Sequence, residues 1–99
     1  MPQLLLIDGD VETERLVQDL SLDLGDLTAL PARTAEDGIR LAAENQPDLI
    51  LLSTDLPDRS GLNTLPDLRE AARSAPVIVI AARESADQAV KAFREGACD

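Results

Sequence analysis

The chain has 99 residues, enough for one domain, and its hydrophobic fraction of 44% supports a packed core. Nine basic residues stand against nineteen acidic ones, and the net charge of −10 argues against direct contact with nucleic acids or anionic membranes. With one cysteine and no histidine, an intrachain disulfide is impossible and a zinc site is excluded in practice. We expect a soluble domain of a reducing cytoplasm, where a lone cysteine is ordinary.

The first part of the chain predicts a strand and then a helix. Residues 4–7 are apolar at successive positions, which is typical of a strand buried on both faces of a parallel sheet. Residues 11–24 carry an amphipathic stripe, with Asp10 as a capping residue before it and Gly25 as its end.

The next pair is a weaker strand and a second helix. Residues 27–30 fit an edge strand that is stopped by Pro31. The helix after it is capped by Thr34 and ends before Pro47. The residues expected to face inward from this helix are Ile39, Leu41 and Ala42.

The second half of the chain repeats the alternation. Residues 49–52 and 77–82 are again continuous apolar runs and predict buried strands. Between them the pattern predicts a helix over residues 62–73. Because Pro66 is expected in a first helical turn, the regular part of this helix is expected to begin as late as Thr64.

A fourth helix is predicted over residues 85–95, so the order is strand and then helix, four times. Right-handed crossovers turn this order into an α/β fold, a doubly wound parallel sheet. In such sheets the functional site forms where the strands end. The polar and small residues at these ends are Asp8, Gly9, Asp10, Ser53, Thr54, Asp55, Ala81 and Ala82.

The segment from Pro47 to Leu62 resembles the phosphoacceptor segment of response-regulator receiver domains, which reads roughly PDLILLDxxLPDxSGL. Asp8 also stands where that family has its first acidic residue. The resemblance covers residues 1–99 and implies a flavodoxin-like sheet in the order 2-1-3-4. It also implies that the family's fifth strand and last helix, with a lysine of the site, fall beyond Asp99.

In the family, a histidine kinase or a small phosphodonor phosphorylates an aspartate at the end of the third strand, with magnesium bound nearby. The family also places a second acidic residue after the first strand and a hydroxyl residue after the fourth. At these three positions the present chain has other residues: Ser53, Gly9 and Ala81.

The resemblance therefore implies a degenerate pseudo-receiver that is not an enzyme and acts independently of phosphorylation. Its role is then that of a signalling module of bacterial type that contacts a histidine kinase or an output domain. The remnant acidic pocket consists of Asp8, Asp10 and Asp55. We expect magnesium to bind weakly, through Asp8 and Asp10, or not at all; Asp10 alternatively serves only as a helix cap.

Two alternatives stay open at this point. The chain is a receiver that is phosphorylated on a substitute acceptor such as Asp55, or it is a truncated fragment that self-associates as a homodimer. Ser53 itself has no histidine or lysine beside it to act as a base, so we do not expect it to be a nucleophile. We expect Cys98 to be a small, semi-buried apolar residue rather than a reactive thiol.

Overall fold

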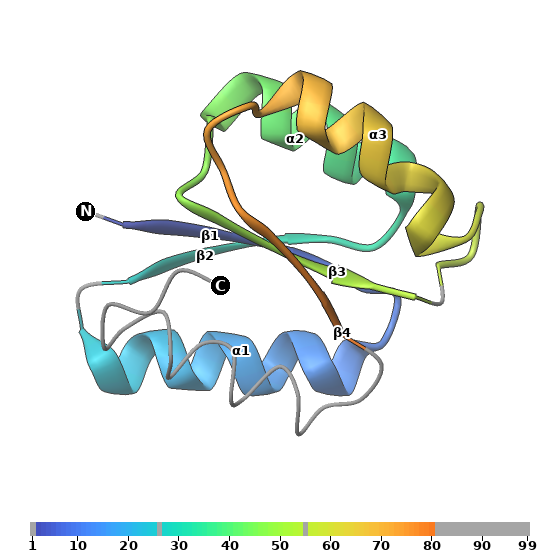
Figure 1. The fold of residues 1–99 in the computed structure, drawn as a ribbon. Coiled ribbons are helices and arrows are strands. Elements are labelled where there is room, and N and C mark those ends of the chain that lie inside the picture. The colour runs from blue at the N-terminus through green and yellow to red at the C-terminus, as the bar shows by residue number, and fades with distance from the viewer. Residues whose placement is uncertain (1, 26, 55, 81–99) are drawn as a thin grey trace.

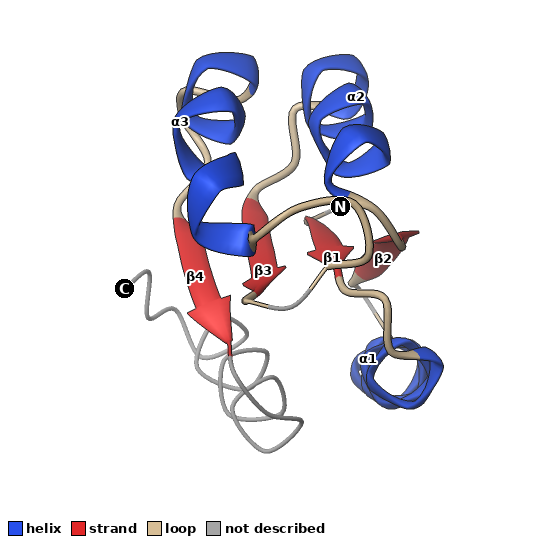
Figure 2. Ribbon diagram, turned by 90° about the vertical axis from the view of Figure 1, so that its right-hand side faces the viewer, coloured by secondary structure: helices blue, strands red, loops and turns tan. Residues whose placement is uncertain are grey.

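The computed structural model describes residues 2–25, 27–54 and 56–80. Four strands form one parallel sheet in the order β2-β1-β3-β4, which confirms the predicted fold class and strand order. Helix α1 covers one face of the sheet, and α2 and α3 lie side by side on the other (Figures 1 and 2). The elements are β1 (Gln3–Ile7), α1 (Val11–Leu24), β2 (Thr28–Ala32), α2 (Ala35–Asn45), β3 (Leu49–Ser53), α3 (Gly61–Ala71) and β4 (Val77–Ile80).

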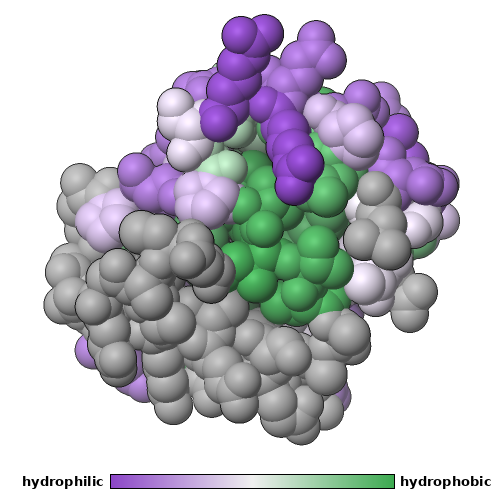
Figure 3. All heavy atoms as spheres, viewed as in Figure 1, coloured by the Kyte–Doolittle hydropathy of each residue, from purple (hydrophilic) through white to green (hydrophobic). Residues whose placement is uncertain are grey.

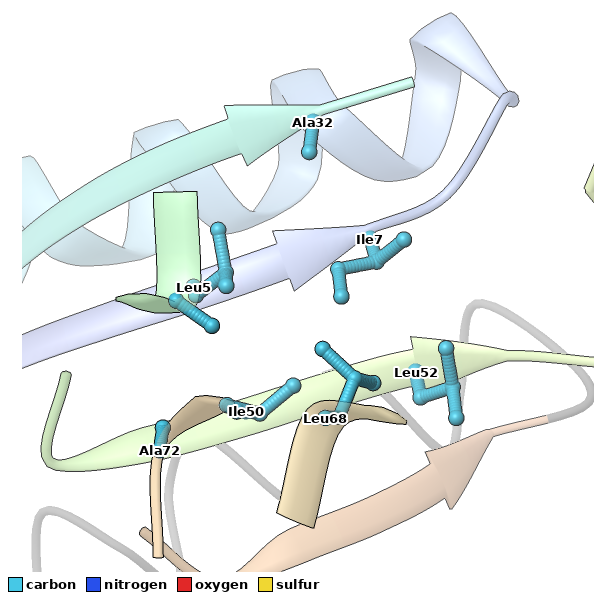
Figure 4. Close-up of a cluster of buried hydrophobic side chains, with 8 residues drawn as sticks. Leu5, Ile7, Ala32, Ile50, Leu52, Leu68 and Ala72 are labelled. Carbon is cyan, nitrogen blue, oxygen red and sulfur yellow. The ribbon is translucent and has the colours of Figure 1, made fainter. Parts of the chain in front are cut away.

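Side chains alternate along β1 and β3, and so build two apolar layers, one on each face of the sheet. On the α1 face the buried residues are Leu4, Leu6, Val17, Leu27, Leu49, Leu51 and Ile80. On the face covered by α2 and α3 they are Leu5, Ile7, Ala32, Ala42, Ile50, Leu52, Leu68 and Ala72, most of which appear in Figure 4. Strands β1 and β3 are thus buried on both faces, as their unbroken apolar sequences predicted.

Local capping residues fix the ends of the first two helices. The Asp10 carboxylate accepts a hydrogen bond from the backbone of Glu12, and Gly25 ends α1 in the left-handed region, at φ 79°. The hydroxyl of Thr34 accepts from the backbone of Asp37 at the start of α2. All three caps confirm the sequence prediction.

Helix α2 packs very closely on β1 because it carries a glycine at the contact. A side-chain carbon added at Gly38 would lie 2.5 Å from Cδ1 of the fully buried Ile7. The sequence prediction had Ile39, Leu41 and Ala42 facing inward. Of these only Ala42 is buried, while Ile39 and Leu41 pack at the edge of the cluster and are half-buried. The absence of a side chain at Gly38 lets the helix backbone approach, and this moves the contact face.

The prediction for β2 was wrong at its end. The strand runs from Thr28 to Ala32 and so includes Pro31, which pairs with Leu6 of β1. Strand β2 is nevertheless an edge strand, as expected. Proline is tolerated there because an edge strand needs backbone hydrogen bonds on one side only.

The prediction for α3 was correct at its start, near Leu62, but wrong about its proline. The helix runs from Gly61 to Ala71, so Pro66 lies inside it rather than in its first turn. The hydroxyl of Thr64 bonds to the carbonyl of Ser60, and the fully buried Leu68 fixes the helix on the sheet. Packing therefore outweighs the one backbone hydrogen bond that a proline removes.

Strand β4 is less buried than β1 and β3, contrary to the expectation for all three apolar runs. Of its four residues only Ile80 is buried, and Val79 is 38% exposed. Figure 3 shows a continuous apolar surface on the side of the molecule where β4 faces the viewer. The last two residues of the predicted strand 77–82, the predicted helix 85–95 and Cys98 lie outside the described residues. No helix in the described part of the chain is long and apolar enough to cross a membrane.

Candidate functional site

The parallel register places Asp8 and Ser53 side by side at the carboxyl ends of β1 and β3. Ile7 and Leu52 are the last pair of the β1–β3 ladder, so Asp8 and Ser53, the residues that follow them, lie next to each other. Both side chains are largely buried, with 9% of Asp8 and 8% of Ser53 exposed. On the other side, Ser53 pairs with Ile80 of β4, and Asp8 donates its backbone N–H to the carbonyl of Ala32. We use the name Ser53 pocket for the strand ends around these two residues, together with the adjacent Gly9 and Asp10.

The Asp8 carboxylate is held by its neighbours inside this pocket. Its Oδ1 accepts a hydrogen bond of 2.9 Å from the backbone N–H of Asp10. Burial raises the pKa of Asp8 above its usual value of 3.8, and the nearby charge of Asp10 acts in the same direction. The Asp10 amide and the hydroxyls of Thr13 and Ser53 oppose that shift, because they hydrogen-bond to the charged form. Ser53 is therefore a hydrogen-bonding neighbour of Asp8.

Asp10 is directed toward its own helix rather than into the pocket. Its Oδ1 accepts from the backbone of Glu12 at 3.0 Å, and its Oδ2 accepts from the buried hydroxyl of Thr13 at 3.1 Å. The carboxylate thus caps α1, which was one of the two roles expected for it. Thr13 was not predicted as part of the site. Its sequence signal is its position three residues after a capping aspartate, where a polar side chain can reach back to the cap.

The segment between β3 and α3, described at Thr54 and at residues 56–60 and here called the β3–α3 loop, lies close to the ends of β1 and β3. The backbone N–H of Gly61 bonds to the carbonyl of Thr54 at 3.1 Å. A side-chain carbon added at Gly61 would collide with the carbonyl oxygen of Ser53, so only glycine permits this approach. Farther along the loop, Pro57 lies against Gly9: a carbon added at Gly9 would be 3.2 Å from Cδ of Pro57.

Asp58, in the same loop, caps a helix that precedes it by more than twenty residues. Its Oδ1 accepts from the backbone N–H of Ala35 at 2.8 Å, and its Oδ2 accepts from that of Glu36 at 3.0 Å. These bonds, led by the one from Ala35, lower the pKa of Asp58 below 3.8. The sequence prediction missed this residue, and no local sequence pattern marks it, because its partners are distant along the chain.

The structure thus brings together four of the residues that the sequence singled out: Asp8, Gly9, Asp10 and Ser53. Asp55 and Ala81 lie outside the described residues. The last contact described between β3 and β4 is the hydrogen bond from the backbone N–H of Thr54 to the carbonyl of Ile80. The pocket's chemistry, within the described residues, is one buried carboxylate surrounded by hydroxyl and amide donors.

A parallel, doubly wound sheet in this strand order defines a flavodoxin-like domain. The chain resembles the signal receiver domain of a putative LuxO repressor protein from Vibrio parahaemolyticus, with a TM-score of 0.73 and 28% identity over 97% of this chain and 73% of that one. It resembles the MaeR response regulator bound to beryllium trifluoride equally well, with a TM-score of 0.73 and 26% identity over 100% and 82% of the two chains.

Curated sequences give the same result. The transcriptional regulatory protein KdpE of Mycobacterium tuberculosis is 35% identical over 99 residues, which are 100% of this chain and 43% of that protein. The nitrate/nitrite response regulator protein NarL of Escherichia coli is 36% identical over 95 residues, 95% of this chain and 44% of that protein. The sequence model of the response regulator receiver domain family matches residues 4–99, and the chain belongs to this family. It spans less than half the length of these curated relatives.

The described residues do not fit the magnesium ion that the family implies. Magnesium prefers several oxygen ligands in octahedral geometry, with carboxylates among them. Asp8 offers a single buried carboxylate, Gly9 has no side chain, and Ser53 has an uncharged hydroxyl. Within residues 2–25, 27–54 and 56–80, no group of three or more His, Cys, Asp or Glu side chains is arranged to hold a metal ion.

Proposed function

We propose that this receiver domain acts as a phosphorylation-independent interaction module, a pseudo-receiver that signals through contacts with other proteins in the cytoplasm. The observation that carries the proposal is the side-chain hydroxyl of Ser53 at the end of β3, hydrogen-bonded to Asp8 in a buried pocket. The partners we propose are a histidine kinase or an output domain. The chain spans less than half the length of KdpE and NarL. The signalling role of a whole protein of that kind is therefore likewise a proposal.

The chemistry of residue 53 supports this proposal. Phosphoryl transfer depends on positioning the nucleophile and on neutralising the charge of the transferred group. A serine hydroxyl is a weak nucleophile unless a base activates it. Asp8 is the carboxylate beside it, and the Ser53 hydroxyl serves as one of the donors that stabilise the charged form of Asp8. A carboxylate is a far weaker base than the histidine or lysine that usually activates a hydroxyl, so we interpret the pair as a structural hydrogen bond.

The charge of the pocket supports it too. A phosphorylated receiver must compensate additional negative charge at the strand ends. The described strand ends instead hold the negative charge of Asp8, which the negative charge of Asp10 repels. Both carboxylates already accept hydrogen bonds from the start of α1. Two arginines of the described residues, Arg33 and Arg59, form ion pairs with Glu14 and Asp67 respectively. Neither pair contributes a free positive charge to the pocket.

The test is the intact mass of the chain after incubation with acetyl phosphate and magnesium, measured at neutral pH beside an active receiver as positive control. We expect the mass to stay unchanged while the control gains a phosphoryl group. A stoichiometric gain that Asp55→Asn abolishes would contradict the proposal and show a substitute acceptor. A gain that Ser53→Ala abolishes would also contradict it, and stability of that adduct to hydroxylamine would distinguish a serine ester from an acyl phosphate.

A further inference from the structure

The β3–α3 loop is closed on itself and attached to two other parts of the molecule. Gly61 bonds back to Thr54 and closes the loop on itself. Pro57 lies against Gly9 at the rim of the Ser53 pocket. Asp58, the next residue, bonds through both carboxylate oxygens to the first two amides of α2. The loop therefore touches the pocket and the helix layer through two adjacent residues.

We infer that Asp58 is a positioning residue that clamps the β3–α3 loop to the first turn of α2, so that the Ser53 pocket and the outer face of α2 change conformation together. The inference deepens the proposed function and rests on it in one respect: a signalling module needs a route from its pocket to a surface that a partner protein can contact.

The clamp differs from an ordinary helix cap in its connectivity. Thr34 already supplies α2 with a local cap, by accepting from the backbone of Asp37. Asp58 reaches the two preceding amides from a different loop, so its hydrogen bonds join two parts of the chain that are 22 and 23 residues apart. Charge-assisted bonds of this kind, from a carboxylate to the positive end of a helix, are stronger than neutral ones. Moving the loop therefore requires either breaking them or moving the first turn of α2.

The surface next to the clamp is hollowed, which makes the clamp accessible to a partner. A hollow of about 550 Å³ is lined by Glu36, Ile39, Arg40, Asp58 and Arg59. It joins the exposed side of α2 directly to the loop residue that holds it. A side chain placed in this hollow would contact the clamp and the helix at once.

The rim of the pocket gives the other half of the coupling. Because Pro57 is so close to Gly9, a methyl group at residue 9 would push on the loop from the pocket side. The residue that it would push, Pro57, is bonded directly to Asp58. A displacement of Pro57 therefore also moves the backbone of Asp58.

The experiment compares two variants that both remove a cap from α2, in the isotope-labelled 99-residue chain, by amide hydrogen exchange. Asp58→Ala releases the loop, whereas Thr34→Ala removes a cap without touching the loop. We expect Asp58→Ala to speed exchange at the Gly61 amide about fivefold, the ratio that corresponds to losing a typical cap, and Thr34→Ala to leave it unchanged. Equal exchange at Gly61 in the two variants would overturn the inference, since Asp58 would then be only a cap.

A second arm approaches from the pocket. Gly9→Ala should shift the amide resonances of Ala35 and Glu36, and unchanged resonances there would also overturn the clamp. If Asp58→Ala does not fold, Asp58→Asn serves in its place, because its amide oxygen keeps one of the two acceptors and should give a smaller effect at the same amides. Neither arm uses a phosphodonor, so failure of the clamp and failure of the phosphorylation-independent role are separate outcomes.

Discussion

Replacing Ser53 by aspartate tests the electrostatics of the pocket directly. The change restores the residue type that the receiver family has at this position, and it exchanges a hydroxyl donor to Asp8 for a second carboxylate. Since residue 53 is only 8% exposed, water can do little to screen the two charges from each other. We expect Ser53→Asp to lower the free energy of unfolding in metal-free buffer at neutral pH.

The size of this loss follows from the geometry. Carboxylates at positions 8 and 53 would lie ~4 Å apart, because the present side chains are within hydrogen-bonding distance. At that separation and an effective dielectric constant of about 20, their repulsion is roughly 4 kcal/mol. Proton uptake by one of them and rotation of the side chains reduce that value. The expected loss is about 1 to 3 kcal/mol, in the upper part of the usual range for single substitutions.

The assay is urea unfolding followed by circular dichroism, with Ser53→Asn as the matched control. Asparagine has nearly the same shape as aspartate and carries no charge, so the difference between the two variants isolates the charge. If Ser53→Asp and Ser53→Asn unfold at the same urea concentration, the electrostatic explanation is wrong. Adding Gly9→Asp should deepen the loss, and magnesium should then raise the unfolding midpoint of the double variant but not that of the parent.

The pH dependence of the same difference has a defined sign. In the folded chain Asp8 binds its proton more tightly than in the unfolded chain, because its pKa is raised above 3.8. The folded state therefore binds more protons in the window just above that value, and stability falls as the pH rises through it. A second carboxylate raises the folded pKa further and widens the window. The difference between Ser53→Asp and Ser53→Asn should thus be largest at neutral pH and shrink as the pH approaches 3.8.

Two further predictions concern the fold. Gly38→Ala should cost about 1 to 3 kcal/mol in urea unfolding, because the added methyl meets the buried Ile7, and a midpoint equal to that of the parent would contradict the close packing of α2 on β1. The 99-residue chain should self-associate at micromolar concentration through β4, because among the described strands β4 pairs only with β3 and exposes Val79. Light scattering should show this association, and Val79→Lys should reduce it. A monomeric parent would refute the prediction.

The parts of the fold that the sequence predicted well are those whose causes are local. An unbroken apolar run identifies a strand buried on both faces, and β1 and β3 meet that description. Likewise Asp10 and Gly25 bond within a few residues of themselves, so their capping roles can be inferred without a three-dimensional structure. Strand β4 has the same kind of sequence as β3 but less burial, because burial depends on what covers a strand and not on its own residues.

The missed features depend on contacts between distant segments. Nothing in the sequence near Asp58 indicates that its carboxylate caps α2, because that helix begins more than twenty residues earlier. Pro66 was expected at the first turn from proline's local preference, yet the packing of Leu68 and the approach of Gly61 to β3 place it inside the helix. In both cases a tertiary contact determines an outcome that local chemistry leaves open.

The residues that carry the family resemblance belong mainly to the frame of the loop rather than to its chemistry. Gly61 is required because any side chain there would collide with the backbone of Ser53, and this holds whichever side chain residue 53 carries. Pro57 fits against Gly9 for an equally steric reason. A chain that keeps this frame will fold like a receiver even after the acceptor has changed, because the strand ends and the loop still meet in the same way. The frame therefore predicts the fold, whereas the side chains around it, such as Ser53 and Asp8, bear on whether a phosphoryl group can be accepted.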